Sequence, residues 1–193
     1  MDCEKFVLAG EDKNTLISVK NALSSSGYIY TGYTKEHANT LRLIRRYTPE
    51  LTVIDVGNNF KDLREQLIII DEEILCACIL ILDYKNDAII DFIKNSRILT
   101  YIRKPIFDEN IIQIAEMSTI NYKRVLEYEQ KLKKLNETLE SRKVVEKAKW
   151  ILVEEKGLSE SEAYDLLRKK SRDSRVPMKN IAEAIILTKG IVN

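Results

Sequence analysis

Short apolar runs alternate with stretches of helical periodicity over the first 120 residues, and this alternation constrains the fold more than any other feature. The five apolar runs lie at residues 6–9, 28–34, 51–54, 79–82 and 99–102. The intervening helical patterns span residues 15–24, 37–47, 63–70 and 88–95, and a fifth begins at Asp108. Strands that alternate with helices build a parallel sheet covered on both faces. The sequence therefore predicts an α/β domain at residues 1–120 with a doubly wound, five-stranded parallel sheet.

Charged side chains directly follow three of the predicted strands. Glu11 and Asp12 follow the first strand, Asp55 follows the third, and Lys104 follows the fifth. In a doubly wound sheet, ligands bind beyond the carboxyl ends of the strands, where these residues would converge. Three carboxylates at one edge repel each other, and a hard divalent cation such as Mg²⁺ suits oxygen ligands. We therefore expect Glu11, Asp12 and Asp55 to form a Mg²⁺ site, to which Lys104 adds a further positive charge.

The motifs VLAGED, VIDVG and YIRKP, taken together, resemble the receiver domain of two-component response regulators. The resemblance covers residues 3–120. It implies a flavodoxin-like fold, phosphorylation of Asp55 by a sensor histidine kinase, and contact of Lys104 with the phosphoryl group.

The sequence departs from the receiver pattern at the end of the fourth predicted strand. The family has Thr or Ser at this position, whereas this chain has Leu82 followed by Asp83. A leucine side chain cannot donate a hydrogen bond to a phosphoryl group, and Asp83 adds negative charge near it. Two interpretations stay open: a receiver that is phosphorylated on Asp55, and a phosphorylation-independent pseudo-receiver that a protein or ligand partner controls.

The segment that follows the α/β domain contains a heptad pattern. Residues 121–142 contain neither Gly nor Pro, and apolar side chains recur there in steps of three and four. These apolar residues are Val125, Tyr128, Leu132, Leu135 and Leu139. Such a pattern pairs a helix with another that carries the same pattern. It predicts a coiled-coil linker helix at residues 121–145 and a parallel homodimer; the alternative is a single helix packed on the chain's own first domain.

The two ends of the chain differ in charge, and the C-terminal end contains a dense basic cluster. Residues 1–120 have a net charge of −4, whereas residues 121–193 have a net charge of +5. Six basic residues within twelve positions are opposed only by Asp173; they are Arg168, Lys169, Lys170, Arg172, Arg175 and Lys179. Cations that meet phosphates release condensed counterions, so this concentration predicts a polyanionic partner.

Three short amphipathic helices surround the basic cluster and predict a small all-α domain at residues 146–193, behind the long helix. Gly157 suits the end of the first helix, and Ser159 with Glu162 forms the pattern of a capping box for the second. Pro177 suits the first turn of the third helix. An apolar stripe on this last helix comprises Ile181, Ala182, Ala184 and Ile185. This arrangement places the basic cluster in the turn after the second helix.

Residues 142–190 resemble the ANTAR domain, an RNA-binding module of transcription antiterminators. The resemblance implies a dimeric regulator without catalytic activity that binds paired RNA hairpins. The candidate RNA contacts are Lys149, Arg168, Arg172, Arg175 and Lys179. Arginine suits this role because its planar guanidinium pairs with phosphates and stacks on unpaired bases. Three helices with a basic turn also fit the major groove of DNA, so a DNA-binding response regulator stays an alternative.

The cysteines and the hydropathy pattern indicate the compartment. Cys3, Cys76 and Cys78 form no spacing typical of a disulfide framework or a metal site, which favours reduced thiols. The N-terminus lacks the pattern of a signal peptide, and no apolar run approaches the ~20 residues that a membrane span requires. We therefore expect a cytoplasmic protein that makes no contact with a membrane.

Overall fold

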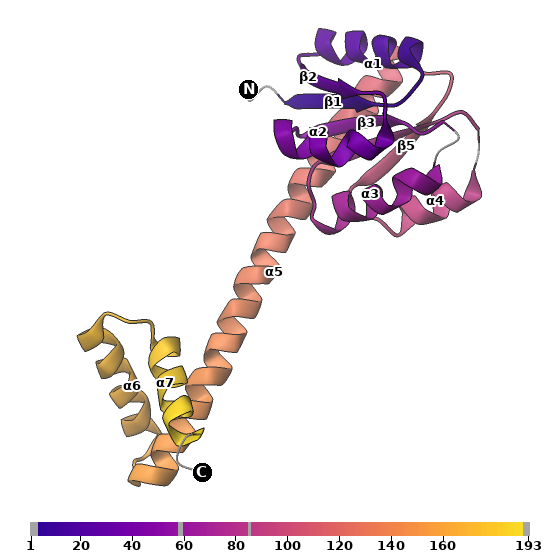
Figure 1. The fold of residues 1–193 in the computed structure, drawn as a ribbon. Coiled ribbons are helices and arrows are strands. Elements are labelled where there is room, and N and C mark those ends of the chain that lie inside the picture. The colour runs from indigo at the N-terminus through magenta and orange to yellow at the C-terminus, as the bar shows by residue number, and fades with distance from the viewer. Residues whose placement is uncertain (1–3, 58–59, 85, 191–193) are drawn as a thin grey trace. The chain divides into compact units, whose positions relative to one another are not determined.

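The computed structural model describes residues 4–57, 60–84 and 86–190. The chain folds as two units, Met1–Tyr128 and Glu129–Asn193. The helix α5 (Asp108–Lys156) contributes residues to both units (Figure 1). Cys3 lies outside the described residues, whereas Cys76 and Cys78 are buried as free thiols.

The first unit is an α/β fold with one parallel sheet. Its strands are β1 (Lys5–Ala9), β2 (Ile29–Thr34), β3 (Leu51–Asp55), β4 (Ala77–Leu82) and β5 (Leu99–Arg103). Its helices before α5 are α1 (Lys13–Ser25), the short 3₁₀ helix η1 (His37–Asn39), α2 (Thr40–Tyr47), α3 (Phe60–Glu72) and α4 (Asp87–Lys94). The strand order is β2-β1-β3-β4-β5, and every neighbouring pair is parallel. The predicted five-stranded, doubly wound parallel sheet is confirmed.

Helices cover both faces of this sheet and form two apolar layers. Side chains of α1 and the beginning of α5 pack on one face, and those of α2, α3 and α4 pack on the other (Figure 1). The central strands β3 and β4 are buried along their whole length, which explains their near-continuous apolar sequence. Because all neighbouring strands are parallel, their carboxyl ends lie at the same edge of the sheet, where the charged residues also lie.

The structure corrects the extent of several predicted helices. The predicted helix at residues 37–47 divides into η1 and α2, and α3 is longer than the predicted span of residues 63–70. The fifth helix does begin at Asp108, but it continues without a break through the predicted linker to Lys156. No residue in this span interrupts a helix, because Gly and Pro are absent from it.

The second unit consists of the end of α5 together with α6 (Glu160–Ser174) and α7 (Met178–Gly190). Val145, Ala148 and Leu152 of α5 pack against both shorter helices, which contribute Ala163, Leu167 and Ala182 to the buried core. The α6 helix begins with the predicted capping box, in which Ser159 and Glu162 bond reciprocally. Two details differ from the predictions: Pro177 lies one residue before α7, and Ala184 is exposed rather than buried.

Candidate functional site

Residues at the carboxyl ends of four strands form an acidic pocket in the first unit. Asp55 is the last residue of β3, and Asp12 caps the N-terminus of α1, shortly after β1. Asp83 directly follows β4, and Lys104 directly follows β5. Lys104 Nζ lies 2.9 Å from Asp12 Oδ2, 3.1 Å from Asp55 Oδ1 and 2.7 Å from Asp83 Oδ1. The lysine thus links three carboxylates that lie at the carboxyl ends of three different strands.

Asp55 is the most enclosed of these carboxylates, with only 3% of its side chain exposed. Its Oδ2 accepts a hydrogen bond from the Asp12 backbone N–H at 3.3 Å. Its Oδ1 faces the Lys104 ammonium, but the geometry is that of an ion pair without a well-directed hydrogen bond, so this buried oxygen has no hydrogen-bond partner within the described chain. A buried oxygen of this kind has unused capacity to accept a proton donor or a cation.

Gly10 packs directly against Asp55, and this role of Gly10 was not predicted from the sequence. Its φ of +136° lies in a region that L side chains rarely adopt, and a Cβ at this position would lie 2.7 Å from Asp55 Cβ. Only glycine therefore allows β1 to end so close to Asp55. The sequence signal for this role was the Gly that directly precedes Glu11.

The charges of the pocket shift two pKa values in opposite directions. Partial burial by itself would lower the pKa of Lys104, but hydrogen bonds to Asp83 and Asp12, together with the negative charge of Asp55, outweigh that effect and raise it. A hydrogen bond from the Thr15 hydroxyl, followed by one from Lys104, lowers the pKa of Asp12. Both groups therefore stay charged at neutral pH, and three carboxylates face a single ammonium.

The pocket contains two of the three predicted Mg²⁺ ligands. Asp12 and Asp55 face Lys104, whereas Glu11 is exposed and its charge acts on the Tyr33 hydroxyl. Across the described residues, no group of three His, Cys, Asp or Glu side chains is already arranged around a metal position. Asp83, which the sequence analysis treated only as an obstacle to phosphorylation, supplies a third carboxylate. The excess negative charge and the unsatisfied Asp55 oxygen fit a hard cation chemically, provided that Lys104 moves aside.

The Leu82 side chain offers no hydrogen-bond donor to this pocket. Leu82 is 3% exposed, and its carbonyl oxygen accepts the Lys104 backbone N–H at 3.0 Å. The residue thus fixes the start of the β5 loop through its backbone while its side chain packs in the core. The structure therefore places an apolar side chain at the position where the receiver pattern has a hydroxyl.

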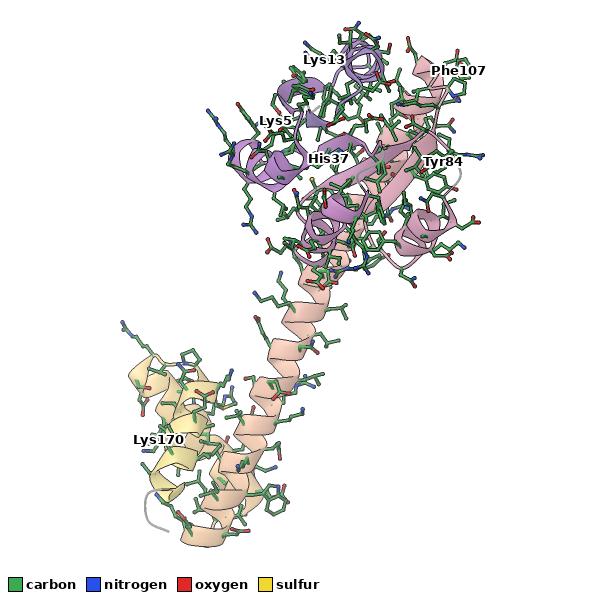
Figure 2. The ribbon with its side chains drawn as sticks, turned by 45° about the vertical axis from the view of Figure 1, so that its right-hand side comes forward. Lys5, Lys13, His37, Tyr84, Phe107 and Lys170 are labelled. Carbon is green, nitrogen blue, oxygen red and sulfur yellow. The ribbon has the colours of Figure 1, made fainter. Side chains whose placement is uncertain are left out.

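A second candidate site is the basic surface of α6. Arg168, Lys169, Lys170 and Arg172 are all exposed and lie within α6 itself (Figure 2 labels Lys170). The predicted location of the cluster in the turn after this helix is therefore wrong for five of its six members, because α6 continues to Ser174 and Lys179 lies in α7. Arg175 does occupy the turn, where it ends the helix in a left-handed conformation with φ 55°.

The five predicted RNA contacts differ in how available their charges are. The side chains of Arg168, Arg172 and Arg175 are exposed and make no ion pair with any described residue. Lys149, by contrast, has only 11% of its side chain exposed and pairs with Glu146 at 2.6 Å and Glu160 at 3.1 Å.

Two of the predicted contacts are thus already engaged inside the second unit. Hydrogen bonds to Glu146 and Glu160 raise the pKa of Lys149, which holds α5 to the beginning of α6. Lys179, in the first turn of α7, lies 3.8 Å from Glu183 and remains partly exposed. The three arginines are therefore the best-presented cations of the cluster.

The heptad residues of α5 fall into two environments. Val125 packs against the core of the first unit, which agrees for this residue with the alternative of a helix packed on its own domain. The other four are exposed large hydrophobic side chains, namely Tyr128 at 61%, Leu132 at 54%, Leu135 at 56% and Leu139 at 44%. Exposed apolar residues at heptad spacing are an unusual surface for a helix that functions alone.

Comparisons with known proteins agree with this two-part organisation. Residues 133–186 match the ANTAR domain. The transcriptional regulatory protein PdtaR of Mycobacterium tuberculosis is 23% identical over 185 residues, which cover 95% of this chain and 90% of that protein.

Solved structures resemble the first unit. The receiver domain of the response regulator NarL from Mycobacterium tuberculosis has a TM-score of 0.52 and 18% identity, and the match covers 62% of this chain and 98% of that one. A response regulator from Thermotoga maritima has a TM-score of 0.52 and 22% identity, with 61% of this chain and 98% of that one covered. These similarities establish the receiver fold.

Among the described helices, none is both long and apolar enough to cross a membrane.

Proposed function

We propose that this chain, in which an ANTAR domain follows a domain with the receiver fold, is a transcription antiterminator that binds paired RNA hairpins. The observation that carries this proposal is the exposed arginine surface of Arg168, Arg172 and Arg175 on the domain that matches ANTAR. Guanidinium groups that lack a carboxylate partner within the described chain can pair with phosphates and stack on loop bases. The chain acts as a regulator rather than an enzyme.

The proposed active form is a homodimer joined through α5. Tyr128, Leu132, Leu135 and Leu139 would form the pairing surface, together with Val125 at its beginning. Burying such side chains contributes roughly 1.5–3 kcal/mol each. A dimer presents two RNA-binding domains, and linking two weak sites raises the apparent affinity for two adjacent hairpins.

The acidic pocket is proposed to control this activity through phosphorylation of Asp55 by a sensor histidine kinase. Asp12 and Asp55, joined by Glu11 after a side-chain rearrangement, would hold Mg²⁺, and the bound ion would neutralise negative charge during phosphoryl transfer. Lys104 would leave its ion pairs with Asp12 and Asp83 when the cation enters, and it would then contact the phosphoryl group on Asp55.

A specific observation favours a second candidate, in which the pocket works without phosphorylation. Leu82 offers no hydroxyl, and the shortest ion pair of Lys104 is with Asp83, at 2.7 Å. Asp83 thus already supplies the lysine with an anion, as a phosphoryl group would. In this case a protein or ligand partner would control a pseudo-receiver, and the RNA-binding function would stay the same. Either form is expected in the cytoplasm.

The first experiment tests the arginine surface. We expect Arg172→Ala with Arg175→Ala to weaken binding of a labelled stem-loop RNA roughly tenfold or more at physiological salt, because each arginine contact contributes about 1–3 kcal/mol. Fluorescence anisotropy measures the Kd, and the slope of log Kd against log salt should fall by about 1 for each lost phosphate contact.

A matched control removes the same amount of charge elsewhere in this domain. Lys147→Ala with Lys156→Ala changes two exposed lysines of α5 that belong to no proposed contact. An unchanged affinity in the arginine variant, or an equal loss in both variants, would refute this surface as the RNA site. Duplex DNA that binds as tightly as the stem-loop would favour the DNA-binding alternative instead.

A further inference from the structure

Two grooves flank the outer strand β2 in the first unit, one on each side. The groove between β2 and α2 has a volume of about 460 Å³ and is lined by Arg42, Arg46, Tyr33 and Tyr47, among others. The groove between β2 and α1 has a volume of about 190 Å³ and is lined by Lys13, Lys20, Tyr30 and Tyr33, among others. Tyr33 lines both grooves, so they adjoin along the strand. We call these four cations and three tyrosines the β2 edge surface.

The four cations of the β2 edge surface have no carboxylate partner among the described residues. Neither groove is lined by an acidic residue. Arg45, between Arg42 and Arg46 on the same helix, instead pairs with Glu73 at 3.1 Å. The surface therefore concentrates positive charge within a unit whose sequence is acidic overall.

The cations of this surface are associated with aromatic rings. Lys20 Nζ lies 4.3 Å from the centroid of the Tyr30 ring, and Arg46 Cζ lies 5.3 Å from that of Tyr47. The Tyr33 hydroxyl donates a hydrogen bond to the Gly10 carbonyl at 2.9 Å, which fixes this ring between the two grooves. Figure 2 shows Lys13 at the beginning of α1.

Few negative charges oppose this surface. Glu36 accepts a hydrogen bond from the Asn39 amide at 2.8 Å, and Asn39 lines the larger groove. Glu11 acts electrostatically on Tyr33. These two carboxylates therefore interact with residues that line the grooves, while the four cations have no ion-pair partner in the described part of the chain.

We propose that the β2 edge surface binds single-stranded RNA, as a second RNA site separate from the ANTAR domain. Proteins that bind single strands combine cations along the sugar-phosphate backbone with aromatic side chains on which bases stack. Cations from both flanking helices are present here, and Tyr33, which is 36% exposed, offers an aromatic ring to a base, whereas Tyr30 and Tyr47 pack partly against the two cores. Single-stranded RNA adjoining a hairpin would be the natural ligand, a role that rests on the proposed function of the chain.

The test uses the full-length protein and a labelled, unstructured pyrimidine RNA of about 12 nucleotides, which is within the ~4–16 nucleotides that single-strand grooves accommodate. Every variant also contains Arg172→Gln and Arg175→Gln, so that binding by the ANTAR domain is weakened throughout. In this background, Arg42→Gln with Arg46→Gln should raise the Kd about tenfold. The slope of log Kd against log salt should fall by about 1.4, because single strands lose roughly 0.7 per phosphate contact.

Lys13→Gln with Lys20→Gln should weaken binding in the same way, because these residues line the other groove. Arg45→Gln is the matched control, since this arginine lies on α2 but is engaged by Glu73; it should leave the Kd unchanged. Circular dichroism melting verifies that the variants stay folded.

Three results would overturn the proposal. They are the absence of saturable binding to the unstructured RNA at low salt, equal affinity in the groove variants and the Arg45→Gln control, and competition by an acidic peptide as strong as that by RNA. The stem-loop assay, in a chain with intact Arg172 and Arg175, separates this test from that of the proposed function. In that chain, Arg42→Gln with Arg46→Gln should retain binding of the stem-loop. A wild-type protein that binds single strands but no stem-loop would refute the hairpin function and would still support the β2 edge surface as an RNA site.

Discussion

At the residue scale, Lys104 is the centre of the acidic pocket. Its ammonium contacts Asp12, Asp55 and Asp83, and the contact with Asp83 is the shortest. The residue that we propose to contact a phosphoryl group is thus already engaged by a carboxylate of its own chain. Any phosphoryl group or divalent cation that enters has to compete with this network.

The pair Leu82 and Asp83 is therefore expected to limit phosphorylation. Replacing them by Leu82→Thr and Asp83→Ala supplies a hydroxyl donor and frees Lys104 from one carboxylate. A hydrogen bond to a charged group contributes about 1.5–3 kcal/mol, so the initial rate of modification by acetyl phosphate with Mg²⁺ should rise roughly tenfold or more. Intact mass spectrometry measures the adduct over time.

Two further variants show whether the adduct belongs to this pocket. Asp55→Ala should give no adduct in either background, and Leu82→Val with Asp83→Ala should separate the effect of the freed lysine from that of the new hydroxyl. A double variant modified no faster than wild type would contradict the proposed role of this pair.

Residues of the pocket differed in how well the sequence predicted them. Asp12, Asp55 and Lys104 were identifiable because strand ends in a parallel sheet converge, and the structure brings them together. Glu11 was predicted to join these residues but is exposed instead. The direction of its side chain depends on the conformation of the turn after β1, and the spacing of residues in the sequence does not specify that conformation. The roles of Gly10 and Asp83 required the packing distances around Asp55 and Lys104.

At the element scale, α5 is the helix through which we propose that the chain associates with a second copy. The helix is continuous from Asp108 to Lys156, and its exposed heptad residues lie between the parts that pack in each unit. A helix with such a row of exposed apolar side chains gains stability by pairing with an identical row.

The dimer proposal predicts a specific effect of charge in this row. Leu132→Asp with Leu135→Asp should convert a dimer into a monomer at micromolar concentration, because paired carboxylates would be buried in an apolar interface. Sedimentation equilibrium measures the mass directly. Met117→Asp with Ile120→Asp alters two exposed apolar residues of the same helix and should preserve the dimer. A wild type that sediments as a monomer throughout this range would contradict the proposal.

Element boundaries were predictable where local signals were strong and failed where a helix could simply continue. The capping box at Ser159 and Glu162 and the positive φ of Gly157 follow the sequence signals. The end of α6 had no such signal, because Arg175 rather than Gly adopts the left-handed conformation there. The basic cluster consequently belongs to a helix surface and not to a turn.

At the scale of the whole molecule, the chain joins a domain with the receiver fold to a domain that matches ANTAR through one shared helix. The acidic pocket lies in the first unit, and the arginine surface lies in the second. The sequence predicted this division from the opposite net charges of its two ends and from two family resemblances. The β2 edge surface could not be predicted from the sequence. Lys13 of α1 and Arg46 of α2 lie near Tyr33 only because both helices pack beside β2.

The most direct test of the account is the stoichiometry and affinity of the complex with an RNA that contains two adjacent stem-loops. Isothermal titration should saturate at two protomers per RNA, and the affinity should exceed that for either single stem-loop by roughly 100-fold, the lower range expected from linking two sites. Duplex DNA of equal length should bind much more weakly. No saturable complex with the stem-loops even at low ionic strength, or equal binding of the duplex DNA, would contradict the central claim.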